Sequence, residues 1–166
     1  MPTTCRFGKP VTCFISVTSV QALVLGGHGD DMVPIRSHTT VNGIPVASLI
    51  KADRLAAIEQ RVRQAGAEVI NLLKTGSAYY SPASSALLMA EAYLSDRKTV
   101  VPAAAYLEGE YGLHDLYVGV PVQIGTGGVE KVLEIALTAE EKKALEGSAS
   151  HVRELVEATG RILAKG

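Results

Sequence analysis

An apolar run that ends in a glycine-rich turn around a histidine is the feature that most constrains the fold of this chain. The run covers residues 20–25 and is typical of a buried strand. Three glycines lie within residues 26–29, where they permit a sharp turn and a close approach of other groups to the backbone. We therefore expect His28 to be held at the end of the strand, with the carboxylate of Asp30 two residues on. An imidazole placed there can exchange a proton near neutral pH, so His28 is a candidate general base. The alternative is a histidine that lies in the turn and has no catalytic role.

The composition predicts one globular domain. Of 166 residues, 47% are hydrophobic and 20% are charged, which is typical of a chain that buries a core. The formal net charge of −1, with no block of like charges, disfavours binding to nucleic acid or to an anionic membrane surface. No apolar run reaches the roughly 18 to 20 residues that cross a bilayer, and the N-terminus lacks a signal-peptide pattern, so we expect a cytoplasmic protein. Cys5 and Cys13 have the spacing of neither a redox pair nor a zinc motif, so no metal site is expected.

A long amphipathic helix is the clearest predicted element. Its apolar residues recur at spacings of three and four and form a single stripe. The stripe consists of Leu55, Ile58, Val62, Ala65, Val69 and Leu72. Asp53 is the expected cap of this helix, and Glu59 and Arg63 are expected to pair on its solvent side.

A second helix follows after a short linker, residues 74–81. Ser81 is its expected cap and Pro82 its first helical residue, and the helix continues to residue 94 with apolar side chains on most sides, which predicts burial. Gly76 and the linker hydroxyls would be available to a ligand if the linker faces a cleft. A simple helix break with caps is the alternative.

The remaining elements complete an α+β pattern. Strands are expected at residues 38–41, 99–107, 116–124 and 129–135, with turns at 42–43 and 125–128. Thr138 and Glu141 form the pattern of a capping box, which starts a final helix. The apolar face of that helix consists of Leu145, Ala149, Val152, Val156 and Leu163. We expect one α+β domain over residues 16–166, preceded by an atypical segment, residues 1–15.

Two other features receive structural interpretations. The glycine-rich residues 125–128 lie between two strands rather than between a strand and a helix, so they predict a hairpin and not a dinucleotide loop. Three further histidines, His38, His114 and His151, are predicted on a strand face, in a loop and on a helix surface. None of the three is assigned a role.

Five segments of the chain resemble malate dehydrogenases of the lactate-dehydrogenase-like type, in order and in spacing. The segments are residues 25–34, 69–82, 102–112, 117–122 and 127–130. The resemblance runs from about residue 16 to the end. It implies the C-terminal, substrate-binding domain of this family, a twisted, mainly antiparallel sheet packed with long helices.

The resemblance also implies roles for particular residues. His28 corresponds to the proton acceptor, and Asp30 would support its turn. Ser77 would contact the substrate near the nicotinamide, and Gly76 would help to shape the pocket. Ser81 would lie near the nicotinamide face, although alanine is more usual at that place. The implied activity is reversible oxidation of malate to oxaloacetate with NAD, in a homo-oligomer that is a dimer or a tetramer.

The resemblance leaves part of the family pattern unmatched. Family members carry about 150 residues of nucleotide-binding Rossmann fold ahead of this region, and no such domain is found in this sequence. The family's Leu-Asp-x-x-Arg segment, whose aspartate pairs with the histidine, has no counterpart: no aspartate or glutamate occurs before Asp30, and Arg6 better matches a non-catalytic arginine. We therefore expect the isolated chain to be inactive as a dehydrogenase. It would be a fragment of a full-length enzyme, one half of a split enzyme, or a non-catalytic remnant that acts as an oligomerisation or interaction module.

Overall fold

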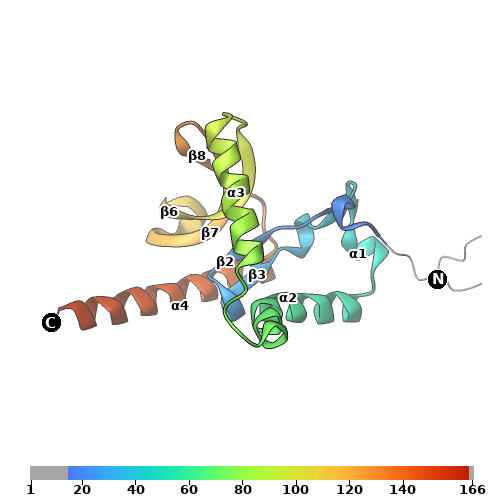
Figure 1. Ribbon diagram of the computed structural model, residues 1–166, viewed down its shortest axis with the longest axis horizontal. Helices are drawn as coiled ribbons and strands as arrows, with labels where there is room; N and C mark the ends of the chain where they lie inside the picture. Colours follow the sequence, from blue (N-terminus) through green and yellow to red (C-terminus); the bar gives the residue numbers. More distant parts are fainter. Residues whose placement is uncertain (1–14, 165–166) are drawn as a thin grey trace, which may run out of the picture.

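The chain folds as a five-stranded antiparallel sheet, a small three-stranded sheet and three long helices (Figure 1). The structure, a computed structural model, describes residues 15–164. The atypical N-terminal segment predicted at residues 1–15 therefore lies almost entirely outside the described residues, as do Cys5, Cys13 and Arg6. The helices are α1 (Val46–Leu49), α2 (Ala52–Leu73), α3 (Tyr80–Leu94) and α4 (Ala139–Leu163).

The main sheet has five strands, all paired antiparallel. Its strands are β2 (Val24–Gly26), β3 (Met32–Pro34), β6 (Thr99–Glu108), β7 (His114–Gly125) and β8 (Gly128–Val132). They follow the order β3-β2-β7-β6, with β8 paired to β7. The long strand β7 supplies most of the core: Leu116, Val118, Val120 and Val122 are each 2% exposed or less. This arrangement confirms the predicted α+β class with a mainly antiparallel sheet.

The apolar run at residues 20–25 is not one strand, as predicted, but two. Its first half is β1 (Val20–Gln21), which pairs with β4 (Thr40–Val41) in a small sheet that β5 (Ile44–Pro45) completes. Its second half is β2 in the main sheet. The run divides because its two ends pair with different partners, and between them the Leu23 carbonyl accepts a hydrogen bond from the Ile35 N–H at 2.9 Å.

The second strand prediction is also only partly correct. His38 lies in a 3₁₀ turn, Arg36–His38, and the strand itself contains only Thr40 and Val41. The turn predicted after them is confirmed, because Asn42 and Gly43 both adopt positive φ, 47° and 81°.

The long helices lie where the sequence predicts them, but three details of their ends and pairs differ. Lys51 precedes α2 in place of Asp53, which lies in the first turn. Helix α3 begins at Tyr80 with Tyr79 before it, so Ser81 is inside the helix and not its cap. Glu59 does not pair with Arg63, because Arg36 from the preceding 3₁₀ turn binds both carboxylate oxygens of Glu59 at 2.8 and 2.9 Å. The predicted capping box of α4, Thr138 with Glu141, is confirmed.

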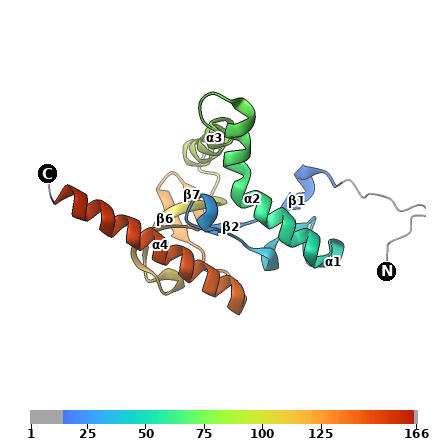
Figure 2. The ribbon, with the colours of Figure 1, turned by 90° about the horizontal axis from the view of Figure 1, so that it is seen from below.

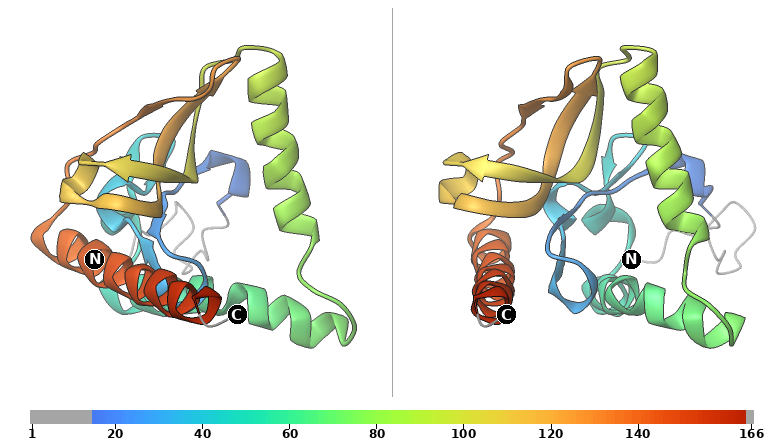
Figure 3. Two further views of the ribbon diagram at one scale, coloured as in Figure 1. Left: turned by 90° about the vertical axis from the view of Figure 1, so that its left-hand side faces the viewer. Right: turned by 60° about the vertical axis from the view of Figure 1, so that its left-hand side comes forward.

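The apolar helix faces are less buried than predicted. In α3, only Ala92 is buried, while Leu87 is 61% and Leu94 78% exposed. The stripe of α2 is likewise buried at Leu55 and 74% exposed at Leu72. Figure 3 shows α3 standing largely clear of the sheet, with only one end near β7.

Helix α4 crosses beneath the main sheet with its N-terminal half and projects beyond it with its C-terminal half (Figure 2). Leu145 and Ala149 in the first half are each 2% exposed, whereas Leu163 is 76% exposed. Among residues 15–164, no helix is both long and apolar enough to cross a membrane.

Candidate active site

His28 occupies the tip of the hairpin that joins β2 to β3. Strand β2 ends at Gly26, His28 is extended, and a 3₁₀ turn over Gly29–Asp31 leads into β3. Gly26 and Gly29 have φ angles of 89° and 73°, which side chains other than glycine rarely adopt. The sequence prediction that glycines shape this turn is confirmed.

Strand β2 pairs with strand β7 at the point where the turn begins. Gly26 pairs with Gly119 across the two strands, and a Cβ placed on Gly119 would lie 2.6 Å from the Gly26 carbonyl oxygen. A glycine at position 119 is therefore required for the β2 strand to approach β7, and this approach fixes where the His28 turn leaves the sheet.

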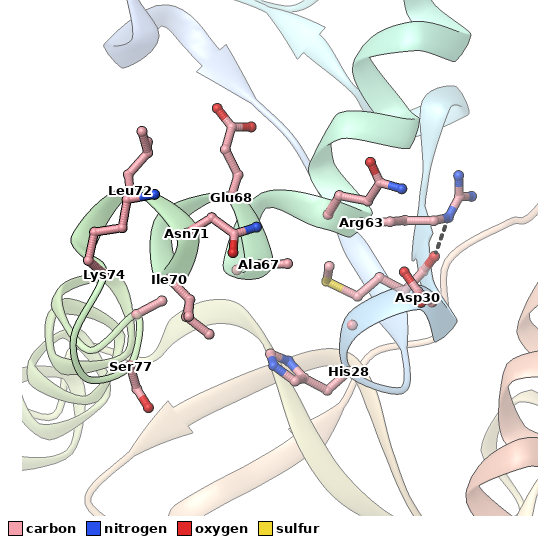
Figure 4. Close-up of a pocket in the computed structure, with 15 residues that line it drawn as sticks. His28, Asp30, Arg63, Ala67, Glu68, Ile70, Asn71, Leu72, Lys74 and Ser77 are labelled. Atoms are coloured by element: carbon pink, nitrogen blue, oxygen red, sulfur yellow. Dashed lines mark hydrogen bonds between the residues drawn. The ribbon is translucent and has the colours of Figure 1, made fainter.

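A broad cleft of about 1110 Å³ opens beside the turn. One wall is the turn itself, including His28 and Asp30, and the other is formed by the C-terminal half of α2 and the linker that follows it. Figure 4 shows the His28 ring projecting from the turn into this space, with Ile70 and Ser77 on the opposite wall. The cleft is therefore wide enough for a small organic acid together with part of a larger ligand.

Three of the five predicted site residues line this cleft. They are His28, Asp30 and Ser77. Gly76 lies next to Ser77 and does not line the cleft itself; its φ of 80° turns the linker. Ser81 lies in α3, outside the lining residues. The linker thus faces a cleft. From the sequence alone, this placement was the condition under which the linker hydroxyls would be available to a ligand.

The way in which α2 ends sets the direction of the linker, residues 74–81. Lys74 adopts a left-handed conformation with φ of 64°, and its N–H closes the last turn by donating to the Ile70 carbonyl. The chain reverses there, and Lys74 and Ser77 both end on the cleft wall.

The cleft carries charges of both signs. Arg63 and Lys74 are its cations, while Asp30 and Glu68 are its carboxylates. The Arg61 guanidinium, which binds Glu68 at 2.7 Å, holds the pKa of that carboxyl below its usual value. Arg63 donates from Nε to the Met32 carbonyl at 3.0 Å, just beyond the His28 turn. An anionic ligand would meet the cations Arg63 and Lys74 on the α2 side, where Arg61 neutralises the Glu68 carboxylate. On the turn side it would meet both an imidazole and the Asp30 carboxylate.

Three residues that contact the turn or its flank were not found from the sequence. The buried Ser148 of α4 bonds the backbone of the turn, His151 pairs with Asp31 at 2.7 Å, and Arg63 reaches Met32. His151 was predicted on a helix surface and assigned no role, and the structure does place it there, 60% exposed at its side chain. No local pattern could have revealed these contacts, because the partners lie 31 to 121 positions apart in the chain.

The residues present suit proton exchange with a small acid better than they suit binding of a whole dinucleotide. His28 and Ser77 offer an imidazole and a hydroxyl across one cleft. In contrast, the glycine-rich residues 125–128 connect β7 to β8, which confirms a hairpin and provides no helix N-terminus for phosphates. Among residues 15–164, no group of three or more His, Cys, Asp or Glu side chains is placed to hold a metal ion.

This combination of an antiparallel sheet, long helices and a histidine turn beside a cleft defines a known class of domain. Residues 12–161 match the family model of the lactate/malate dehydrogenase α/β C-terminal domain, so the chain belongs to the lactate/malate dehydrogenase family. Two of the relatives that the chain matches are malate dehydrogenases. A malate dehydrogenase of Myxococcus xanthus is 53% identical over 153 residues, which cover 92% of this chain and 48% of the relative. One of Chloroherpeton thalassium is 53% identical over 143 residues, 86% of this chain and 46% of the relative.

Solved structures of the family have the same fold. The malate dehydrogenase of Salinibacter ruber superposes with a TM-score of 0.88 at 50% identity, over 91% of this chain and 49% of that one. A lactate dehydrogenase of Eimeria maxima, solved with NADH and oxamate, superposes with a TM-score of 0.85 at 41% identity. The match covers 90% of this chain and 48% of that one. The chain therefore spans about half the length of the relatives that it matches.

Proposed function

We propose that this chain supplies the catalytic-histidine half of an NAD-dependent malate dehydrogenase, which oxidises (S)-malate reversibly to oxaloacetate. The observation that carries the proposal is the placement of His28 and Ser77 on facing walls of one open cleft. Similarity to malate dehydrogenases over most of the chain supports the choice of substrate class.

In this proposal His28 accepts the hydroxyl proton when malate is oxidised. In the reverse direction the protonated imidazole donates to the carbonyl oxygen of oxaloacetate, so the same group acts as base and as acid. Ser77 contacts the substrate from the other wall, and the turn at Gly76 gives the Ser77 side chain its position. Arg63 and Lys74 provide positive charge for a dicarboxylate.

NAD, when bound, would accept the hydride that leaves the C2 carbon of malate. Ser77, and less directly Ser81 at the start of α3, are the residues of this chain that would lie near its nicotinamide end. The body of the dinucleotide needs a glycine-rich loop that opens a helix, whereas the glycine-rich residues 125–128 lead into strand β8. A nucleotide-binding half, on the same polypeptide or on a separate one, would hold it.

A fusion tests this function directly. The N-terminal half of the Myxococcus xanthus malate dehydrogenase is joined ahead of this chain, and oxidation of NADH is measured with oxaloacetate and, in parallel, with pyruvate. We expect oxaloacetate-dependent activity, and His28→Gln should lower kcat about 10²–10⁴-fold, the contribution typical of general acid–base catalysis. The unfused chain should have negligible activity.

Binding of NADH to the fusion shows that it has folded. A fusion that binds NADH and still fails to reduce oxaloacetate would refute the proposal and favour the non-catalytic remnant, as would equal activity of the His28→Gln variant. Activity that returns when the two halves are expressed as separate chains would demonstrate that this chain can serve as half of a split enzyme.

The exposed apolar faces favour a second role, association with another subunit. Leu87 and Leu94 on α3 and Leu155 on α4 are 61%, 78% and 65% exposed. Apolar side chains gathered on unpartnered helices are typical of interfaces. We infer that the chain is part of a homo-oligomer, and measurement of its mass in solution tests this inference.

A further inference from the structure

The His28 turn is held from outside its own segment by one buried hydroxyl. The N–H of Gly27 donates to Ser148 Oγ at 2.8 Å, and the Ser148 hydroxyl donates in turn to the Asp31 carbonyl at 2.6 Å. The two backbone groups lie on either side of His28, so a single side chain bridges the whole turn. Ser148 is 5% exposed, so water does not compete freely for these bonds.

The glycines that precede His28 make room for this contact. A Cβ on Gly26 would lie 2.5 Å from Ser148 Oγ, and one on Gly27 would lie 3.3 Å from Val152 Cγ2. Helix α4 therefore packs directly against the backbone of the turn. The glycine pair permits this approach as well as the bend itself.

A second residue of α4 holds the same end of the turn. His151 lies one helical turn beyond Ser148, and its Nδ1 is 2.7 Å from Asp31 Oδ1. Asp31 is thus bound at its carbonyl by Ser148 and at its carboxylate by His151. The neighbouring carboxylate, Asp30, lines the cleft instead, so the two adjacent aspartates point to different surroundings.

We propose that Ser148 and His151 are positioning residues for His28: acting through the backbone and through Asp31, they fix the direction in which the imidazole enters the cleft. The inference rests on the proposed role of His28 as acid and base. Proton transfer requires the base within hydrogen-bond reach of the substrate, and a displacement of about 1 Å can lower a rate about 100-fold. Neither positioning residue lines the cleft, so neither would contact the substrate.

Kinetics of the fused enzyme separate positioning from substrate binding. Ser148→Ala should lower kcat about 10- to 100-fold while KM for oxaloacetate stays within about twofold, because the substrate contacts are untouched. Ser150→Ala is the matched control, since Ser150 is an exposed serine on the same helix, and it should leave both constants unchanged. His151→Ala should lower kcat, and His151→Asn, which keeps a donor near the position of Nδ1, should restore it.

Nuclear magnetic resonance of the unfused chain provides a readout that does not depend on activity. Ser148→Ala should speed amide exchange at Gly27 at least about tenfold and shift the ring resonances of His28, because the bridged amide loses its acceptor. Ser150→Ala should change neither. Retained protection at distant amides of β6 and β7 shows that the variant remains folded.

The outcomes distinguish the two proposals. An inactive parent fusion that binds NADH refutes the proposed function alone, and the resonance measurements still decide whether Ser148 orders the turn. A parent that is active through His28, combined with a Ser148→Ala variant of equal kcat and unchanged Gly27 exchange, overturns the positioning role. A rise in KM with kcat preserved would also overturn it, since that pattern indicates altered substrate binding.

Discussion

Gly26 and Gly119 pair across strands β2 and β7, and the Gly26 backbone occupies the space that a side chain at position 119 would need. The Cβ of an alanine at 119 would lie 2.6 Å from the Gly26 carbonyl oxygen, a backbone atom that can move only if the strands separate. The position of the His28 turn relative to the sheet therefore depends on a contact made entirely of backbone.

Gly119→Ala should accordingly destabilise the fold by about 1–3 kcal/mol, the usual cost of inserting a methyl group where no space exists. Urea denaturation followed by circular dichroism measures this change. Gly147→Ala is the matched control, because Gly147 lies within α4 and, apart from that helix's own backbone, no atom would lie within 4 Å of the added methyl group. This control should instead stabilise the fold by about 0.5–1 kcal/mol. Equal stabilities of the two variants would contradict the close approach.

The carboxylate of Glu141 joins the start of α4 to the 3₁₀ turn before β4. It accepts hydrogen bonds from the Ser37 N–H and hydroxyl at 2.9 and 2.7 Å and from the Thr138 N–H at 3.0 Å. Burial by itself would raise the pKa of Glu141, but these donors outweigh it and hold the pKa below the usual 4.5. Its contribution to stability is therefore complete above pH 4.5 and is lost as the pH falls through the lowered pKa of the folded state.

Glu141→Gln should lower the free energy of unfolding at neutral pH by about 1–3 kcal/mol. The variant's free energy of unfolding should also depend less on pH in the acid range. Denaturation curves recorded from neutral pH downward provide the measurement. Glu140→Gln, a change at the exposed neighbour, should leave both quantities close to those of the parent. A similar acid dependence in the Glu141 and Glu140 variants would show that Glu141 is not responsible.

His151 should titrate above its ordinary pKa of 6.5, because the Asp31 carboxylate stabilises the protonated ring through a hydrogen bond and through its charge, with a smaller effect of Glu154. The sign follows from linkage: the stability that this pair contributes is fully present below pH 6.5 and is lost as the pH rises through the raised folded-state pKa. Proton resonances of the ring, followed through the titration, report the pKa.

Asp31→Asn should return the His151 pKa toward its ordinary value, whereas Asp30→Asn should have little effect, since no bond joins Asp30 to the ring within the described part of the chain. If the two asparagine variants shift the titration equally, a general charge effect and not the Asp31 pair sets the pKa.

The exposed apolar face of α3 should drive self-association. Sedimentation velocity of the chain should show species above the 17.5 kDa of a single copy. A double variant, Leu87→Ser with Leu94→Ser, should shift the population toward that mass without loss of stability, because both side chains are exposed in the single copy. Val17→Ser, at a side chain 86% exposed outside α3, is the control and should not change the distribution.

The sequence predicts local structure well in this chain. The turn around His28, the extent of α2, the capping box at Thr138 and the hairpin at residues 125–128 were all predicted, because each is decided by residues a few positions apart. The resemblance of five segments to malate dehydrogenases led to the correct family. The cleft that brings His28 and Ser77 to facing walls agrees with the site expected from that resemblance, while their roles remain predictions.

The caps predicted at Asp53 and Ser81 and the strand predicted at His38 were wrong locally, and the other wrong predictions concern partners far apart in the chain. Nothing in the run at residues 20–25 indicates that its two halves join different sheets, since the choice depends on which strands they meet. Glu59 has a correctly spaced partner in Arg63, but the fold brings Arg36 closer, and a bidentate guanidinium pair is the stronger contact. The prediction overestimated the burial of α3 for a similar reason. An apolar helix surface indicates that protein will cover the helix, but it does not indicate that the covering residues belong to the same chain.

The bridge from Gly27 to Ser148 has a consequence for the order of events during synthesis. Its two partners are 121 positions apart, and α4 is the last element of the described fold. During translation, the histidine turn leaves the exit tunnel of the ribosome long before the ribosome has synthesised α4, the helix that completes the hydrogen bonds of the turn. A nascent chain with β2 and β3 already outside the exit tunnel therefore still lacks the bond between Gly27 and Ser148, which can form only after α4 has also left the tunnel.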